Sequence, residues 1–182
     1  FIAEADEYTT DPTQPFSPRF AYQHPQIIIC TNIEFDHPDV YTDLDHTKAV
    51  FVDFFNQLPS DGLLLINAES PINQSILPRL KVKYQTYPGQ FNQANATAAI
   101  KAALTLGFDP GKAATALEDF TGTKRRFEKI ADINGVLLYD DYAHHPPHIR
   151  ATLTAAKTSM AFFFLNKRYA IIFATSPLII IE

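Results

Sequence analysis

The segment Tyr139–Pro147 holds the densest set of chemically useful side chains in this sequence. It reads Tyr-Asp-Asp-Tyr-Ala-His-His-Pro-Pro, and it follows the apolar run Val136–Leu138. Titratable side chains between the end of a strand and the start of a helix suit the binding of phosphate, ribose or a metal-bound nucleotide. The alternative is a polar loop with Pro146 in the first turn of a helix, in which His148 is simply exposed.

Two further acid-rich segments follow apolar runs. Glu4–Glu7 comes after Phe1–Ala3, which is expected to end a buried strand, and Thr31–His37 comes after Gln26–Cys30. Either segment alone is typical of a solvated loop. Because the carboxyl ends of parallel strands meet at one edge of a sheet, the two segments together favour a Mg²⁺ site. Glu4 is a more usual ligand for Mg²⁺ than His37.

Amide and guanidinium groups provide two more candidates. Asn92 and Asn95 lie three residues apart, hence on one face of a helix, where one could cap the helix or bind the edge of a purine. Their spacing does not decide between these roles. Lys124–Arg126 is typical of a solvated basic turn, but Arg126, beside Phe127, could also point inward as a phosphate clamp.

The elements that must position these residues predict an α/β fold. Gln26–Cys30 is almost wholly apolar, which is typical of a strand covered on both faces. Helical spacing over about Asp45–Leu58 and the apolar run Leu63–Ile66 complete a βαβ unit of a parallel sheet. A short helix, a strand, an alanine-rich helix ending at Gly107 and a helix opening at Pro110 are expected to follow, near 71–80, 82–87, 92–106 and 110–120.

The last part of the chain is expected to start with a hairpin. Asn134-Gly135 is a strong signal for a tight turn between strands over 130–132 and 136–139. A helix from Pro146 and strands over 169–173 and 178–181 are expected after it. We place a domain boundary near Asp140, giving domains 1–139 and 140–182.

Composition excludes several classes of protein. The net charge is −5 without a basic block, so nucleic-acid binding has no electrostatic support. Cys30 is the only cysteine, which excludes a disulfide framework and predicts a buried thiol. No apolar run reaches the ~20 residues of a membrane span, and no signal peptide is visible, so a cytoplasmic location is expected. Because the chain opens at Phe1 and its one methionine is Met160, we expect a fragment.

Taken in order, these segments resemble the Mur ligases, and within that family most closely the branch that joins L-alanine to UDP-N-acetylmuramate. The segments that carry the likeness are Glu4–Glu7, Thr31–His37, Asn92–Ala96, Phe120–Phe127 and Asp140–Pro146. The likeness covers about Phe1–Lys157. It implies a partial P-loop-type ATPase central domain with a parallel sheet, followed by the start of a Rossmann-like C-terminal domain.

The resemblance also implies a reaction and a set of roles. ATP phosphorylates a carboxylate of the UDP-sugar, and an amine then attacks the acyl phosphate. Glu4 and His37 would be Mg²⁺ ligands, and Asn92 and Asn95 would lie beside the adenine. Arg126 would contact the ATP phosphates and Asp141 the ribose, while His144 and His145 would contact the phosphates or the substrate. The catalytic candidates are Arg126, His144 and His145.

The sequence departs from the family at several points. It contains no G-x-x-x-x-G-K-[ST] phosphate loop, Phe91 stands where the family usually has His, and the likeness fades beyond Lys157. The chain alone is therefore expected to be catalytically inactive. A ligase for murein tripeptide and an inactive nucleotide-binding remnant are the alternatives.

Overall fold

The computed structural model describes all residues except 12, 14–17, 90, 162–167, 174–175 and 182. The chain divides into two compact units, Phe1–Leu117 and Glu118–Glu182, called here the first and second units. The boundary that we expected near Asp140 lies inside the second unit, because the strand ending at Asp141 pairs with strands on both sides of it.

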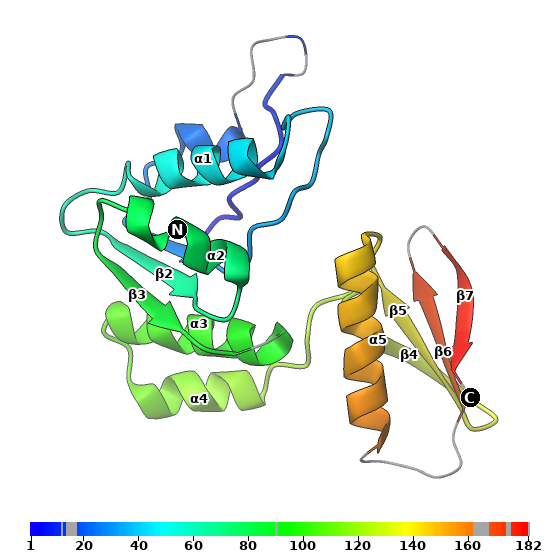
Figure 1. The fold of residues 1–182 in the computed structure, drawn as a ribbon. Coiled ribbons are helices and arrows are strands. Elements are labelled where there is room, and N and C mark those ends of the chain that lie inside the picture. Colours follow the sequence, from blue (N-terminus) through cyan, green and yellow to red (C-terminus); the bar gives the residue numbers. More distant parts are fainter. Residues whose placement is uncertain (12, 14–17, 90, 162–167, 174–175, 182) are drawn as a thin grey trace. The chain divides into compact units, whose positions relative to one another are not determined.

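The first unit is built on a parallel sheet with the strand order β1-β2-β3 (Figure 1). Its strands are β1 (Ile27–Cys30), β2 (Leu63–Asn67) and β3 (Tyr84–Tyr87). The helix α1 (Leu44–Phe55) connects β1 to β2, and α2 (Pro71–Ile76) with a short 3-10 turn (Leu77–Arg79) connects β2 to β3. The expected βαβ unit is therefore confirmed, and with it the α/β class.

Side chains alternate between two cores on the faces of this sheet. Ile28, Cys30, Leu64 and Ile66 pack with residues of α1 and α2 on one face. Leu63 and Leu65 pack on the other face against α3 (Phe91–Thr105), whose Ala94 and Ala98 are buried. All five residues of β2 are buried because both of its faces are covered.

Two sequence expectations for the first unit are wrong. The strand β1 is not covered on both faces, since Ile29 is 42% exposed at the edge of the described sheet. Phe1–Ala3 forms no strand, and Phe1 and Ile2 are fully exposed. A strand requires a hydrogen-bonded neighbour, and among the described residues none pairs with these three.

The helices begin and end at recognisable signals. The Asp43 carboxylate accepts a hydrogen bond from the His46 amide at the start of α1, and the Ser70 hydroxyl caps α2 in the same way. Gly107 follows α3 with a φ of 82°, as expected for the residue that ends a helix. The helix α4 (Pro110–Glu118) follows. No helix in the described parts of the chain is both long and apolar enough to cross a membrane.

The second unit contains a mixed sheet with the strand order β4-β5-β6-β7. The strands are β4 (Glu128–Ile133), β5 (Val136–Asp141), β6 (Arg168–Phe173) and β7 (Ser176–Ile181). The first two form the expected antiparallel hairpin, with φ of 52° at Asn134 and 83° at Gly135 in the turn. The helix α5 (Pro146–Ala161) connects β5 to the parallel strand β6. Its buried Ala156 forms a small core with Ala143, against which Phe127, Tyr139, Ile149 and Leu153 pack.

Candidate functional site

Two carboxylates and an imidazole come together in the first unit. One ligand atom each from Glu7, Asp36 and His37 lie within 4.8 Å of one another, and we call these residues the acid–histidine cluster. The His37 Nε2 is 3.6 Å from the Glu7 Oε1 and 3.7 Å from the Asp36 Oδ2. The three side chains are half-buried, so the cluster is accessible to solvent.

The backbone around His37 explains how the cluster is held. His37 has a φ of 55°, and its amide donates a hydrogen bond to the Asp36 Oδ1 at 2.7 Å. Its carbonyl accepts from the amides of Val40 at 2.8 Å and Tyr41 at 3.0 Å. The buried Tyr41 hydroxyl donates to the Glu7 carbonyl at 2.7 Å, which joins the loop after β1 to the acidic segment.

The acidic segment is fixed from its other side by residues 18–20. The Arg19 amide donates to the Tyr8 carbonyl at 3.0 Å, and the Phe20 amide donates to the Asp6 carbonyl at 3.1 Å. The Tyr8 ring then lies 4.8 Å from the His37 ring, centroid to centroid. Glu7 is therefore oriented by its two neighbours in the chain.

This donor set suits a divalent cation. Carboxylate oxygens are the ligands that Mg²⁺ and Mn²⁺ prefer, and an imidazole with two carboxylates leaves other positions open for water or a bound substrate. His37 was singled out from the sequence, whereas Glu7 and Asp36 were not. Glu4, the other predicted ligand, is exposed and lies outside the cluster. The sequence signal for both carboxylates was the pairing of the segments Glu4–Glu7 and Thr31–His37, which does not tell which acid of each segment lies in the cluster.

The two predicted asparagines lie at the start of α3. Asn92 and Asn95 are both exposed, on either side of the buried Ala94. The preceding Gly89, with a φ of 119°, passes so close to α3 that a Cβ there would lie 2.8 Å from the Ala94 nitrogen. The Asn67 side-chain amide at the end of β2 donates to the Gly89 carbonyl at 3.3 Å, and the Glu69 carboxylate just after the strand accepts from the Gly89 amide at 2.9 Å. The helix start is thereby fixed at the carboxyl ends of β2 and β3.

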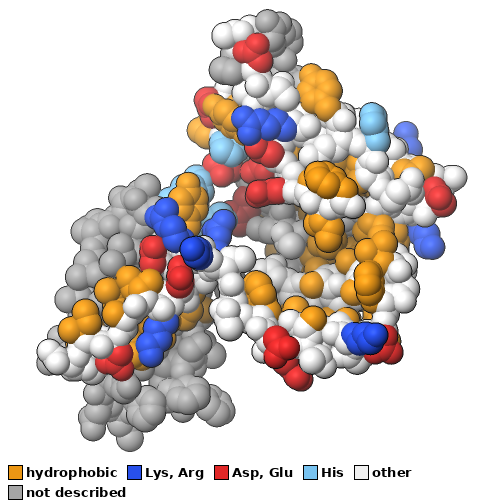
Figure 2. All heavy atoms as spheres, turned by 180° about the vertical axis from the view of Figure 1, so that it is seen from behind, with side chains coloured by type: hydrophobic (Ala, Val, Ile, Leu, Met, Phe, Trp, Pro, Cys, Tyr) orange, Lys and Arg blue, Asp and Glu red, His pale blue; other side chains and the backbone are white. Residues whose placement is uncertain are grey.

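Cations and imidazoles gather in the second unit, at the start of α5. The guanidinium carbons of Arg125 and Arg126 lie 5.1 and 5.5 Å from the centroid of the Tyr142 ring. Figure 2 shows blue Lys and Arg side chains beside pale blue His side chains at one end of this unit. We call this set the cation–histidine cluster; its members are Arg125, Arg126, Tyr142, His144, His145 and His148.

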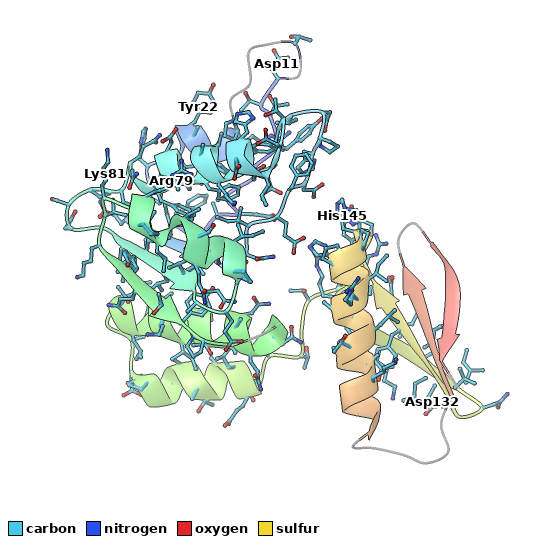
Figure 3. The ribbon with its side chains drawn as sticks, viewed as in Figure 1. Asp11, Tyr22, Arg79, Lys81, Asp132 and His145 are labelled. Carbon is cyan, nitrogen blue, oxygen red and sulfur yellow. The ribbon has the colours of Figure 1, made fainter. Side chains whose placement is uncertain are left out.

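Three imidazoles form one side of the cation–histidine cluster. Ring centroids are 4.3 Å apart for His144 and His145 and 5.6 Å apart for His145 and His148. His145 lies at the N-terminal end of α5 (Figure 3). His148 is exposed, as expected, but its place beside His145 was missed, although a spacing of three residues on a helix predicts a shared face.

The cation–histidine cluster is suited to bind an anion. It combines two guanidinium groups and three imidazoles with the amino end of a 16-residue helix, where backbone amides favour negative charge. Asp140 forms an ion pair with this cluster, since its Oδ2 is 3.3 Å from the Arg125 Nε. The predicted residues Arg126, His144 and His145 are thus brought together. Asp141 is buried and only 6% exposed.

Comparison with known proteins matches both units to domains of one family. Residues 18–87 match the model of the Mur ligase middle domain, and residues 125–175 match that of the Mur ligase, glutamate ligase domain. The UDP-N-acetylmuramate–L-alanine ligase of Desulforamulus reducens is 33% identical over 87% of this chain and 41% of its own length. The enzyme of the same name from Paenarthrobacter aurescens is 34% identical over the same shares.

Solved structures agree with these matches. A murein peptide ligase from Psychrobacter arcticus has a TM-score of 0.58 and 27% identity, over 80% of this chain and 38% of its own. The UDP-N-acetylmuramate-alanine ligase of Thermotoga maritima has a TM-score of 0.58 and 26% identity, over 76% of this chain and 39% of its own. The chain spans about two fifths of the curated relatives that it matches, 41% of the first two. From its two matched segments and their order, this chain belongs to the Mur ligase family.

Proposed function

We propose that this chain is part of an ATP- and Mg²⁺-dependent ligase that joins L-alanine to the carboxylate of UDP-N-acetylmuramate in peptidoglycan synthesis. One observation carries the proposal: the likeness to ligases of that name runs through 87% of the chain. The location that we propose is the cytoplasm, and the substrates are small molecules.

The proposed reaction has two steps. The carboxylate of the sugar attacks the γ-phosphorus of ATP, an acyl phosphate forms and ADP leaves. The amine of L-alanine then attacks the acyl carbon, phosphate leaves and the nitrogen gives up a proton. Both steps depend mainly on positioning and on neutralising phosphate charge, because the chemistry is carried by the substrates.

The first unit supplies a place for the divalent cation in this proposal. Mg²⁺ when bound would neutralise charge on phosphate oxygens. The ligand expected from both the resemblance and the cluster geometry is His37. Glu7 and Asp36 offer carboxylates within 4.8 Å of it, and the resemblance adds Glu4. The exposed amides of Asn92 and Asn95 are proposed to bind the adenine edge.

The second unit supplies the cations for the phosphates. Arg126, His144 and His145 are proposed to contact the ATP phosphates or the substrate carboxylate. The support is the gathering of two guanidinium groups and of imidazole N–H donors in the cation–histidine cluster, in which Arg125 also pairs with Asp140. Protonated or neutral, an imidazole presents at least one N–H donor to an anion.

Product formation with the complete reading frame tests the proposal. The protein is incubated with ATP, Mg²⁺ and UDP-N-acetylmuramate, with either L-alanine or murein tripeptide, and the products are identified by mass spectrometry. L-alanine is expected to be joined. Preference for the tripeptide would instead assign the recycling activity, which the similarity to the Psychrobacter murein peptide ligase supports. No product with either would indicate an inactive remnant.

The 182-residue chain provides a separate test of the phosphate loop. It contains no G-x-x-x-x-G-K-[ST] sequence, so we expect it to bind Mg-ATP weakly and to release no phosphate. Sustained ATP hydrolysis by this chain would contradict the need for such a loop.

A further inference from the structure

The acid–histidine cluster is assembled from two segments that lie far apart in the sequence. Glu7 comes from the acidic segment 4–7, whereas Asp36 and His37 come from the loop after β1. Both segments are irregular backbone, outside the helices and strands. Because sheet pairing does not hold them against each other, other contacts must keep their ligand atoms within 4.8 Å.

Tyr41 contacts the backbone of both segments. Its amide donates a hydrogen bond to the His37 carbonyl at 3.0 Å, and its hydroxyl donates one to the Glu7 carbonyl at 2.7 Å. Tyr41 is only 1% exposed, and its ring centroid lies 5.7 Å from that of His46 on α1. The bridge between the two segments therefore runs through a buried side chain.

The loop residue at one end of this bridge needs support. His37 has a φ of 55°, a left-handed conformation that few residues other than glycine adopt. Such a residue keeps this conformation only where the surrounding structure holds it. The amides of Val40 and Tyr41 both donate to its carbonyl, so the position of Tyr41 bears directly on the conformation of His37.

The Tyr41 hydroxyl is a reliable donor in this setting. Burial, and after it the charge of Glu7, raises the pKa of Tyr41 above its ordinary value of 10.0, so the hydroxyl stays protonated at neutral pH. A second bond, from the Tyr8 hydroxyl to the Asp39 Oδ2 at 2.9 Å, is exposed to solvent. Water can replace the partners of an exposed bond, whereas a partly buried carbonyl that loses its donor keeps a desolvation penalty.

We propose that Tyr41 is a positioning residue for the divalent cation, whose hydroxyl holds the acidic segment 4–7 against the loop 31–37 so that the ligands of both segments face one site. The inference rests on the proposed function, in which these segments hold Mg²⁺. It does not depend on which acid of segment 4–7 binds the cation, because the hydrogen bond is made to the backbone of that segment.

The test compares two buried tyrosine hydroxyls. Tyr41→Phe removes the bond to Glu7 and keeps the ring in the core. Tyr87→Phe is the matched control, because Tyr87 is fully buried and its hydroxyl donates to the Cys30 carbonyl at 3.0 Å instead of to the cluster. Each variant loses one hydroxyl bond to a backbone carbonyl, so a similar small decrease in the urea midpoint of unfolding is expected.

The first measurement is the affinity of the 182-residue chain for Mn²⁺, followed by the electron paramagnetic resonance of the free ion. We expect Tyr41→Phe to weaken Mn²⁺ binding about fivefold, the usual effect of losing one neutral hydrogen bond, and Tyr87→Phe to leave it unchanged. Unchanged affinity in Tyr41→Phe would overturn the proposal. Equal losses in both variants would overturn it as well, since affinity would then follow stability alone.

The second measurement needs no metal. The Val40 amide donates to the His37 carbonyl at 2.8 Å, so its hydrogen exchange reports how firmly the loop is held. Tyr41→Phe is expected to accelerate this exchange about fivefold and Tyr87→Phe to leave it unchanged.

The two measurements separate failure of the inference from failure of the proposed function. If the unchanged chain binds no Mn²⁺, the proposed cation site fails, and the exchange of the Val40 amide alone decides the positioning role. An unchanged exchange rate in Tyr41→Phe then rejects that role. Failure of Tyr41→Phe to fold, while Tyr87→Phe folds, would assign the hydroxyl to folding and reject the role as well.

Discussion

The two units carry clusters of opposite charge that are held by different means. The acid–histidine cluster of the first unit lies on loops that are anchored by backbone pairing and by a buried tyrosine, Tyr41. The cation–histidine cluster of the second unit depends on a buried carboxylate and on stacked rings. In the first unit, which has the larger apolar core, most of the bonds that fix the loops join backbone groups, with Tyr41 as a buried side-chain anchor. In the second unit, whose described core is small, the Asp141 carboxylate and stacked rings hold the site.

The two units also differ in the size of their described apolar cores. The first unit buries all of β2 between two layers of helices, whereas the described burial of the second unit centres on Ala143 and Ala156 with partly buried neighbours. The comparison predicts that core packing contributes more to the stability of the first unit than to that of the second.

The largest expected effect concerns the reactivity of Cys30. Burial raises the pKa of its thiol to about 12 from the ordinary 9.0, so at neutral pH the thiolate fraction falls about a thousandfold. In the native chain we expect alkylation by iodoacetamide at pH 8 to be slower than in urea by at least that factor. Lys157→Cys in a Cys30→Ala background is the exposed control. Rapid labelling of native Cys30 would show that the core of the first unit opens readily.

The next effect is on the stability of the first unit. Leu65 is fully buried between β2 and α3, so Leu65→Ala should lower the free energy of unfolding by about 3 kcal/mol. Urea unfolding followed by circular dichroism measures it. Ile130→Ala on β4, at a side chain that is 48% exposed, should cost well under about 1 kcal/mol. Similar losses at both positions would remove the contrast between the units.

A smaller effect is expected at the cation ligands. His37→Asn keeps a residue that tolerates positive φ but removes the imidazole, so Mn²⁺ binding, measured by the electron paramagnetic resonance of the free ion, should weaken about tenfold. His24→Asn, at an exposed histidine of the same unit, should leave Mn²⁺ affinity unchanged. Equal Mn²⁺ affinity in both variants would exclude His37 as a ligand.

The smallest effect lies in the hairpin of the second unit. Gly135 has a φ of 83°, so Gly135→Ala should destabilise the chain by about 1 kcal/mol in urea unfolding. Asn134→Gly keeps a residue suited to positive φ and should cause little loss. If Gly135→Ala leaves the free energy of unfolding unchanged, the conformation of this turn does not determine the stability of the second unit.

The sequence predicted elements wherever local signals agreed with their surroundings. The apolar run of β2, the alanines of α3 and the Asn134-Gly135 turn each specify one structure on their own. Ile29 was misjudged because its burial depends on what lies beside β1, not on the residue itself.

The sites were harder to predict because they depend on contacts between distant segments. Glu7 reaches His37 only because its neighbours pair with Arg19 and Phe20, which no spacing in the sequence reveals. Arg126 and His145 could be selected by residue type, but the buried bonds of Asp141 to both segments could not be.

A bond across the first sheet limits how this part of the chain can vary in length. The buried Tyr87 hydroxyl at the end of β3 donates to the Cys30 carbonyl at the end of β1 at 3.0 Å, spanning the intervening β2. An insertion or deletion within any of the three strands would shift one end relative to the other and turn its side chains to the wrong face. Changes in length during evolution are therefore expected in the connecting loops, while the carboxyl ends of the three strands stay aligned.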